Sequence, residues 1–300
     1  MNVMLDIFLG AISLGLLWAV MTIGVYITYR ILDIADLTVE GSIAMGAAIA
    51  AKAISLGVNP FAATALALLG GLTAGLITGL LHTKLKIPAL LSGILTMIAL
   101  YSVNLHIMGK ANVALLRMDT VYTPFTKLGM SKRDAVIVLG FICVSAVVGI
   151  LYWFFGTEIG SAIRATGDNP HMVRAQGINT NMMKITGLVI SNGLVAISGA
   201  LIAQSQGFAD VQMGTGSIVI GLASVIIGEV LFGRKSFFSR LLSLALGAMT
   251  YRIIIAFVLK LGMPANDLKL FTAITVAIAL ALPVFKTYLH PIKISIKESD

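Results

Sequence analysis

Residues 4–29 read MLDIFLGAISLGLLWAVMTIGVYITY, a run of 26 residues in which Asp6 is the single charged side chain. A membrane-spanning helix needs about 20 predominantly apolar residues. This run is longer than the apolar part of a cleavable signal peptide, and residues 1–3 carry no positive charge. We therefore expect residues 4–29 to form a transmembrane helix that is retained in the protein.

The rest of the chain has the same character. Of its 300 residues, 58% are hydrophobic and 11% are charged, whereas about 25% of the residues of a soluble domain are charged. A net charge of +8 does not indicate nucleic-acid binding, because the Lys and Arg residues lie in short gaps between apolar runs and no basic patch is interleaved with aromatics. The composition predicts a multi-pass protein of the cell membrane, surrounded by lipid.

The apolar runs predict an all-α transmembrane bundle of about nine segments. The second and the seventh are the weakest, because each is short or interrupted by glycine. The segments are about 4–29, 38–57, 61–83, 88–108, 135–156, 183–205, 217–232, 237–259 and 266–286.

Charge in the connecting loops predicts the orientation of these segments, since Lys and Arg accumulate on the cytoplasmic side. With the C-terminus inside and the N-terminus outside, twelve Lys and Arg residues lie on the cytoplasmic side and eight on the other. The difference is modest because the 109–134 loop places five of them outside. We take this orientation as the prediction.

The two weak segments begin with the same pattern, Gly-Ser-Ile-x-x-Gly, at 41–46 and at 216–221. Chance similarity between glycine-rich apolar helices is one interpretation. The other is an inverted repeat of broken helices, because the predicted topology sends the two segments across the membrane in opposite directions. Helix starts inside a membrane offer free backbone N–H groups to a substrate, and such pairs mark transport sites. The candidates for the substrate path are Gly41, Ser42, Gly216 and Ser217.

Three charged residues within or beside the apolar runs extend this set. Arg252 lies near the middle of its segment, where a charge is costly and needs a partner. It either forms an ion pair with Glu229 or snorkels toward the surface, or it contacts the carboxylate of a substrate. Glu40 either lines the path and meets a substrate ammonium or is a solvated charge at the membrane edge.

The longest polar stretch predicted on the cytoplasmic side is GSAIRATGDNPHMVRAQGINT, residues 160–180. A turn at 167–169 precedes Pro170, which suits the first turn of a helix. Residues 171–176 then form a short helix that Gly177 ends. A simple connection would be shorter, so we expect this loop to dock another protein.

The same stretch resembles the coupling loop of ATP-binding cassette permeases in the branched-chain amino acid and ribose group. The resemblance rests on Arg164-Ala165, on Gly-Asp-Asn at 167–169 and on Gly-Ile-Asn-Thr at 177–180. The loop residues that it implicates are Arg164, Gly167, Asp168, Asn169, Pro170, His171, Arg174 and Gly177.

The resemblance covers most of the chain. A departure is Glu229, which stands where the branched-chain group usually has a pair of glycines. Within the group, the sequence of residues 165–170 and of Tyr251-Arg252 is most similar to the sequences of permeases for tryptophan or other amino acids. The further matching positions are 23–26, Asp36, Gly41, 199–204, Gly216-Ser217 and Gly228.

This resemblance implies that residues 1–300 form one transmembrane permease domain that pairs with a second, identical copy. Two nucleotide-binding ATPase subunits would dock on the 160–180 loop and carry ATP and Mg²⁺. A separate extracytoplasmic binding protein would deliver a small solute, expected to be an amino acid.

The chain itself is predicted to have no catalytic residue, cofactor or metal site. Residues 228–236 come close to a phosphate-binding loop, but an extra Arg separates Gly233 from Lys235 and no strand precedes them. The four His residues have no metal-ligand spacing. The main alternative function is a secondary transporter driven by an ion gradient, and a channel or a membrane enzyme is the third.

Overall fold

The computed structural model describes residues 3–233, 236–260, 270–278 and 281. Within these residues, six helices are long and apolar enough to cross a membrane. They are α1 (Val3–Tyr26, extended by a π-helical turn, Ile27–Ile31), α3 (Pro60–Thr83), α4 (Ala89–Met108), α6 (Lys132–Gly156), α9 (Thr180–Gln206) and α11 (Phe237–Lys260).

The two segments that the sequence marks as weak form shorter helices, α2 (Thr38–Ser55) and α10 (Ser217–Phe232). The prediction of a helical membrane bundle is confirmed, although two short strands are also present, and the count of nine segments is not confirmed. The ninth predicted segment, 266–286, is described only at 270–278 and 281, and these residues are helical. The rest of this segment lies outside the described residues.

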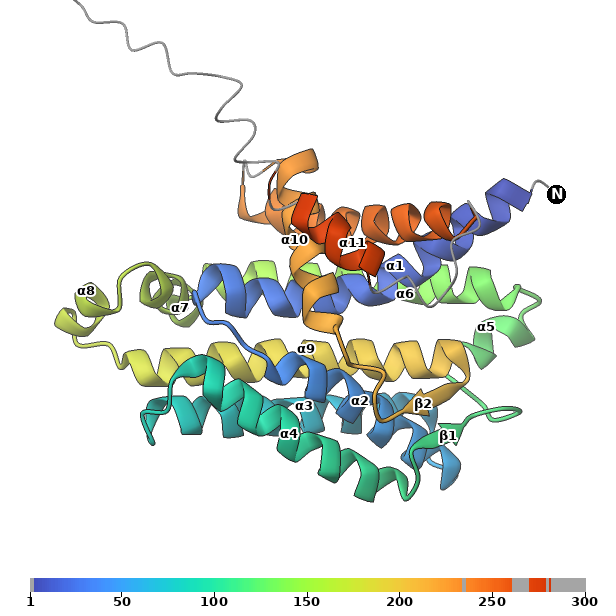
Figure 1. Ribbon diagram of the computed structural model, residues 1–300, viewed down its shortest axis with the longest axis horizontal. Helices are drawn as coiled ribbons and strands as arrows, with labels where there is room; N and C mark the ends of the chain where they lie inside the picture. Colours follow the sequence, from blue (N-terminus) through green and yellow to red (C-terminus); the bar gives the residue numbers. More distant parts are fainter. Residues whose placement is uncertain (1–2, 234–235, 261–269, 279–280, 282–300) are drawn as a thin grey trace, which may run out of the picture.

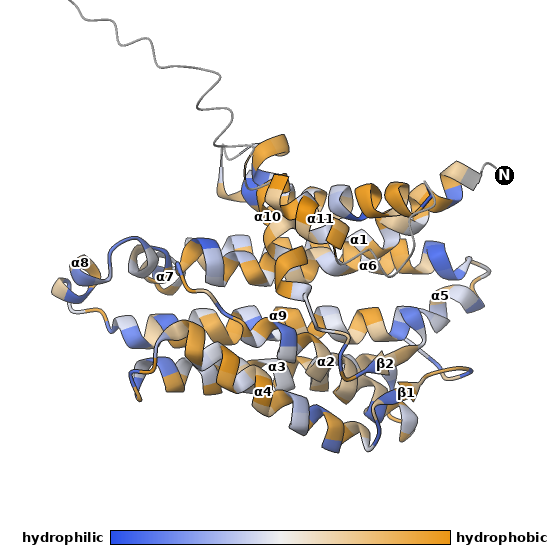
Figure 2. Ribbon diagram, viewed as in Figure 1, coloured by the Kyte–Doolittle hydropathy of each residue, from blue (hydrophilic) through white to orange (hydrophobic). Residues whose placement is uncertain are grey.

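Short elements gather at the two ends of the bundle. The helices α7 (Glu158–Asp168) and α8 (Pro170–Ala175) lie at one end. The other end carries α5 (Thr123–Lys127) and two antiparallel strands, β1 (Asn112–Ala114) and β2 (Phe208–Asp210) (Figure 1). Hydrophobic residues run along the long helices, and hydrophilic residues concentrate at these two ends (Figure 2). The pattern is that of a protein whose middle lies in lipid.

The core forms around α9, which packs against α1, α2 and α3. On the side of α3, three glycines four residues apart face it: Gly71, Gly75 and Gly79. A Cβ atom at Gly71 would overlap the carbonyl oxygen of Asn192, and one at Gly75 would overlap that of Leu188. Small residues at this spacing let two membrane helices meet backbone to backbone.

The short helices α2 and α10 start near each other and run to opposite ends of the bundle. The last turn of α2 packs at Ile54 with Val113 of β1, at the end that carries the strands. The last turns of α10 bring Glu229 to Arg30, which follows α1, at the end that carries α7 and α8. The sequence prediction that these segments run in opposite directions agrees with this arrangement.

Candidate functional site

The start of α2 is buried inside the protein and held by polar side chains. Asp36 lies two residues before the helix and is 2% exposed. Its Oδ1 accepts a hydrogen bond from the backbone N–H of Thr38 at 2.9 Å, and its Oδ2 accepts one from Asn192 at 2.8 Å. Asn192 in turn accepts a hydrogen bond from Ser42 at 2.7 Å. These bonds allow a helix to begin within the bundle, where water cannot satisfy its first backbone groups.

The start of α10 lies against the first turn of α2. Gly216 precedes the helix with a φ of +80°, a conformation that favours glycine. Its backbone N–H donates a hydrogen bond to Oε1 of Glu40 at 2.9 Å. The hydroxyl of the next residue, Ser217, is buried and has no hydrogen-bond partner in the described part of the chain. The two Gly-Ser-Ile helix starts thus meet at one place.

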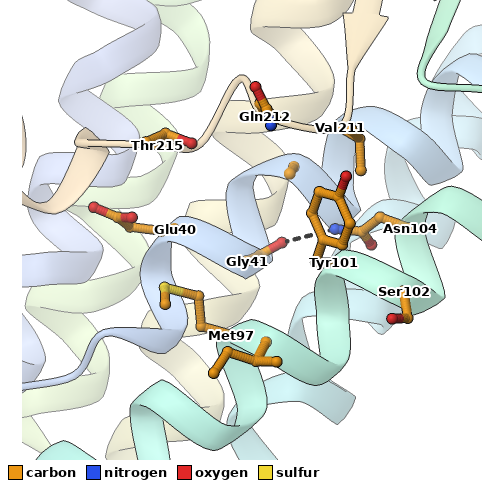
Figure 3. A pocket seen from close by; sticks show the side chains of 11 residues that line it. Glu40, Gly41, Met97, Tyr101, Ser102, Asn104, Val211, Gln212 and Thr215 are labelled. Atoms are coloured by element: carbon orange, nitrogen blue, oxygen red, sulfur yellow. Dashed lines mark hydrogen bonds between the residues drawn. The ribbon is translucent and has the colours of Figure 1, made fainter.

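A cavity of about 420 Å³ opens beside this meeting point (Figure 3). It lies between α2, the second half of α4 and the segment that follows β2. Glu40 is the one charged residue in its wall, and the other side chains are a mixture of apolar and uncharged polar groups. The lining residues are Glu40, Gly41, Ala44, Met97, Ile98, Tyr101, Ser102, Asn104, Val211, Gln212 and Thr215.

Asn104 is a part of this wall that the sequence analysis missed, since it lies inside an apolar run that reads as a lipid-facing helix. The residue is wholly buried. Its amide nitrogen donates to the carbonyl oxygen of Gly41 at 3.2 Å (Figure 3). Its amide oxygen is buried without a hydrogen-bond partner among the described residues. An Asn inside a predicted membrane segment was the signal that could have revealed it.

Glu229 does not join the cavity beside Glu40. It lies at the other end of α10, where the Nε atom of Arg30 is 3.4 Å from its Oε1. The Glu229 side chain is 4% exposed and that of Arg30 is 44% exposed. Both line a second cavity, of about 560 Å³, which also contacts Arg164 and Asp168 of α7. Glu229 therefore lies between the membrane helices and the loop expected to dock a partner.

Arg252 also lies apart from the cavity beside Glu40. Its guanidinium carbon is 4.1 Å from the centre of the Trp18 ring, a cation–π contact. Its Nε atom is buried, and no hydrogen-bond partner for it exists within the described ranges. The Arg252–Glu229 ion pair was one of the interpretations that the sequence allowed. In the structure Glu229 has Arg30 as a salt-bridge partner, and Arg252 contacts Trp18.

The loop at 160–180 contains the short helix that the sequence predicts. In α8, Asn169 is the N-cap residue, and its side-chain oxygen accepts hydrogen bonds from the backbone N–H groups of His171 and Met172 at 3.1 and 3.0 Å. Pro170 is the first residue of the helix. Gly177 follows it with a φ of +82°. The local chemistry of the cap and the terminating glycine explains why the prediction holds.

The prediction of a turn at 167–169 is wrong for its first two residues. Gly167 and Asp168 form the last turn of α7, which Thr157 caps at the other end by accepting a hydrogen bond from the N–H of Gly160. A Cβ atom at Gly167 would overlap the carbonyl oxygen of Ile31. Close packing on the end of α1 therefore explains this glycine, which the sequence analysis took as a sign of a turn.

The two arginines of the loop hold its shape. Arg174 donates from Nε and from one terminal nitrogen to the hydroxyl of Thr180, at 3.2 and 3.0 Å. Arg164 donates to the carbonyl oxygen of Phe155 at 2.9 Å. The side chains of His171 and Met172 are exposed, so the outer face of α8 is available to a partner.

The comparisons with known proteins agree with the fold. The chain is 43% identical over 273 residues to a tyrosine transport system permease protein of Clostridioides difficile, which covers 91% of this chain and 90% of that protein. It is 26% identical over 185 residues to the ribose import permease protein RbsC of Escherichia coli, over 60% of this chain and 56% of that one.

Among solved structures, the chain is similar to PsaBC from Streptococcus pneumoniae. The TM-score is 0.52 at 15% identity, over 93% of this chain and 91% of that one. A metal-chelate type ABC transporter in an inward-facing conformation gives a TM-score of 0.51, also at 15% identity, over 94% and 85% of the two chains. At this identity the likeness shows a shared fold.

The family model described as branched-chain amino acid transport system / permease component matches residues 7–282. Because this match spans most of the chain and the tyrosine permease aligns over nearly its whole length, the protein belongs to that family of ABC transporter permeases.

Proposed function

We propose that this protein is the membrane-spanning subunit of an ATP-binding cassette importer and that its substrate is an amino acid, with tyrosine as the first to test. The observation that carries this proposal is the 43% identity to a tyrosine transport permease over 91% of the chain. The family, described by branched-chain amino acid transport, supports the same class of substrate.

The energy would come from separate ATPase subunits that bind ATP and Mg²⁺. The feature in favour is the outer face of α8, because it presents His171 and Met172 on a helix whose ends are fixed by Asn169 and Gly177. A fixed, exposed helix suits rigid docking, since little conformational entropy is lost when a partner binds it.

The proposal includes an orientation and further partners. The end with α7 and α8 faces the cytoplasm, and the end with β1 and β2 faces outward, where an extracytoplasmic binding protein would deliver substrate. With this orientation the N-terminus is outside, as the distribution of Lys and Arg predicts. The working unit would hold two copies of this chain in the cell membrane.

Uptake by the reconstituted system tests the proposal. The chain is expressed with the ATPase subunit and the binding protein encoded beside it, purified as a complex and placed in proteoliposomes. We expect uptake of radiolabelled tyrosine that requires ATP on the side of the ATPase. Uptake by this chain alone, driven by an ion gradient and insensitive to ATP, would overturn the proposal in favour of a secondary transporter.

Docking is tested separately by co-purification. The double variant His171→Asp/Met172→Asp should lose the ATPase subunit, because both substitutions place charge on an outer helix face expected to be buried by the partner. The matched control is Leu128→Asp, at an 81% exposed position at the opposite end of the bundle. Retention of the ATPase by the double variant would remove α8 from the docking surface.

A further inference from the structure

The cavity beside the meeting point of α2 and α10 has a chemistry that selects one part of an amino acid. We propose that this cavity holds the substrate ammonium group at the carboxylate of Glu40, a binding site that rests on the proposed amino-acid transport.

Glu40 offers one carboxylate oxygen to a ligand. Its Oε1 accepts the hydrogen bond from the N–H of Gly216 at 2.9 Å, and within the described part of the chain Oε2 has no hydrogen-bond partner. The bond to Gly216 also fixes the side chain, so the second oxygen is held in place before a ligand arrives. An ionised carboxylate accepts hydrogen bonds and donates none, so the ligand group must be a donor.

Asn104 offers a second acceptor. The carbonyl oxygen of Gly41 can only accept, so the amide nitrogen of Asn104 must be the atom that faces it at 3.2 Å. This assigns the other amide atom as the oxygen, which is buried without a partner among the described residues. A buried acceptor left empty is unfavourable, and a donor from a ligand would remove that penalty.

The carboxylate oxygen of Glu40 calls for a group that donates, and an ammonium has three donors and no acceptor. The charge supports the same choice, because Glu40 is the one ionised residue in the wall and no Lys or Arg lines it. A substrate carboxylate would find no cation here. The cavity therefore favours an amine over a simple carboxylic acid.

The remaining wall suits an apolar or aromatic side chain. Met97, Ile98 and Val211 supply apolar surface, and Tyr101 supplies an aromatic ring (Figure 3). A volume of about 420 Å³ lies within the range of pockets that bind small molecules. Tyr101 is 47% exposed and Ile98 is 60% exposed, so this side of the wall is not covered by other described parts of the chain.

Thiol labelling can report occupancy of this cavity directly, because Cys143 is the one cysteine of the chain. In a Cys143→Ser background, Ser102→Cys places a thiol in the cavity wall and Ser55→Cys places one at the exposed last residue of α2, outside the cavity. The purified permease–ATPase complex is labelled with a methanethiosulfonate reagent without ligand or with tyrosine, tyramine or 3-(4-hydroxyphenyl)propionate. Tyramine lacks the carboxylate and the last compound lacks the ammonium.

We expect tyrosine and tyramine to slow labelling of Ser102→Cys at least threefold and to leave Ser55→Cys unchanged. The propionate should protect neither. Adding Glu40→Gln, which keeps an oxygen for the N–H of Gly216 but loses the charge, should remove the protection. Protection by all three compounds, by none of them, or unchanged protection with Glu40→Gln would each overturn the inference.

Uptake separates this inference from the proposed function. We expect Glu40→Gln to raise the KM for tyrosine uptake about tenfold or more, whereas Asp119→Asn, which neutralises a 71% exposed carboxylate, should leave it unchanged. If the wild-type complex transports no amino acid, the proposed function fails. If it transports tyrosine and Glu40→Gln does so equally well, the site alone is wrong.

Discussion

Asn192 on α9 donates a hydrogen bond across 2.8 Å to the carboxylate of Asp36, which lies two residues before the start of α2. Both residues are buried, and the same Asn192 side chain accepts from Ser42 at 2.7 Å. One amide therefore joins the start of a short helix to the central helix of the bundle. It also supplies one of the hydrogen bonds that make a buried carboxylate tolerable.

Replacement of this amide should be costly. We expect Asn192→Leu to lower the free energy of unfolding by at least about 2 kcal/mol, because Asp36 and Ser42 each lose a buried hydrogen-bond partner. Unfolding in mixed detergent and dodecyl sulfate micelles measures the change. Asn181→Leu, at an exposed position of the same helix, should shift it by less than about 0.5 kcal/mol. Equal stability of the two variants would contradict the prediction.

The contact between α3 and α9 predicts a strong response to one methyl group. Gly75→Ala should destabilise the protein by about 1–3 kcal/mol, because the new Cβ would overlap the backbone carbonyl of Leu188 and force the helices apart. Gly149→Ala is the matched control, since nothing lies within 4 Å of a Cβ atom there. It should stabilise α6 by up to about 1 kcal/mol, the usual gain in helix propensity. A similar sign for both variants would refute close packing as the cause.

The salt bridge between Arg30 and Glu229 should be measurable as a coupling energy. We expect the cycle of Arg30→Gln, Glu229→Gln and the double variant to give about 0.5–3 kcal/mol, toward the lower end because Arg30 is 44% exposed. Thermal or chemical unfolding of the four proteins supplies the numbers. The two losses would simply add if these side chains were independent, and additivity within error would contradict the pairing.

Arg252 should matter for transport more than for stability. We expect Arg252→Leu to abolish uptake. The level of this variant in the membrane should stay normal, since removing a buried cation relieves a desolvation penalty. Arg252→Lys should retain part of the uptake, because it keeps the charge but stacks less well on the Trp18 ring. Uptake in proteoliposomes and thermal stability are measured together. Near-normal transport by Arg252→Leu would exclude Arg252 from the path.

Local chemistry explains which features could be predicted from the sequence. The cap at Asn169, the proline after it and the glycine at 177 are decided by residues next to one another, and the predicted helix is present as α8. The repeated Gly-Ser-Ile pattern pointed to the starts of α2 and α10, which the structure joins through Glu40 and Gly216.

Contacts between distant segments explain the rest. The pairing of Glu229 with Arg30 and the stacking of Arg252 on Trp18 join residues far apart in the chain, so spacing alone could not select them. Asn104 looked like part of a lipid-facing helix because its neighbours are apolar. Gly167 was interpreted as a turn residue because the sequence alone does not distinguish a glycine required for close packing from a glycine required for its backbone freedom.

The glycines of α3 have a mechanical consequence. Where two helices touch backbone to backbone, no side chain between them can change rotamer and let one helix slide along the other. We therefore expect α3 and α9 to travel together as a rigid body during a transport cycle. The hinge and shear movements that expose the cavity to one side and then to the other should fall on contacts such as that of α4 with α3, where the side chains of Thr96 and Thr78 meet.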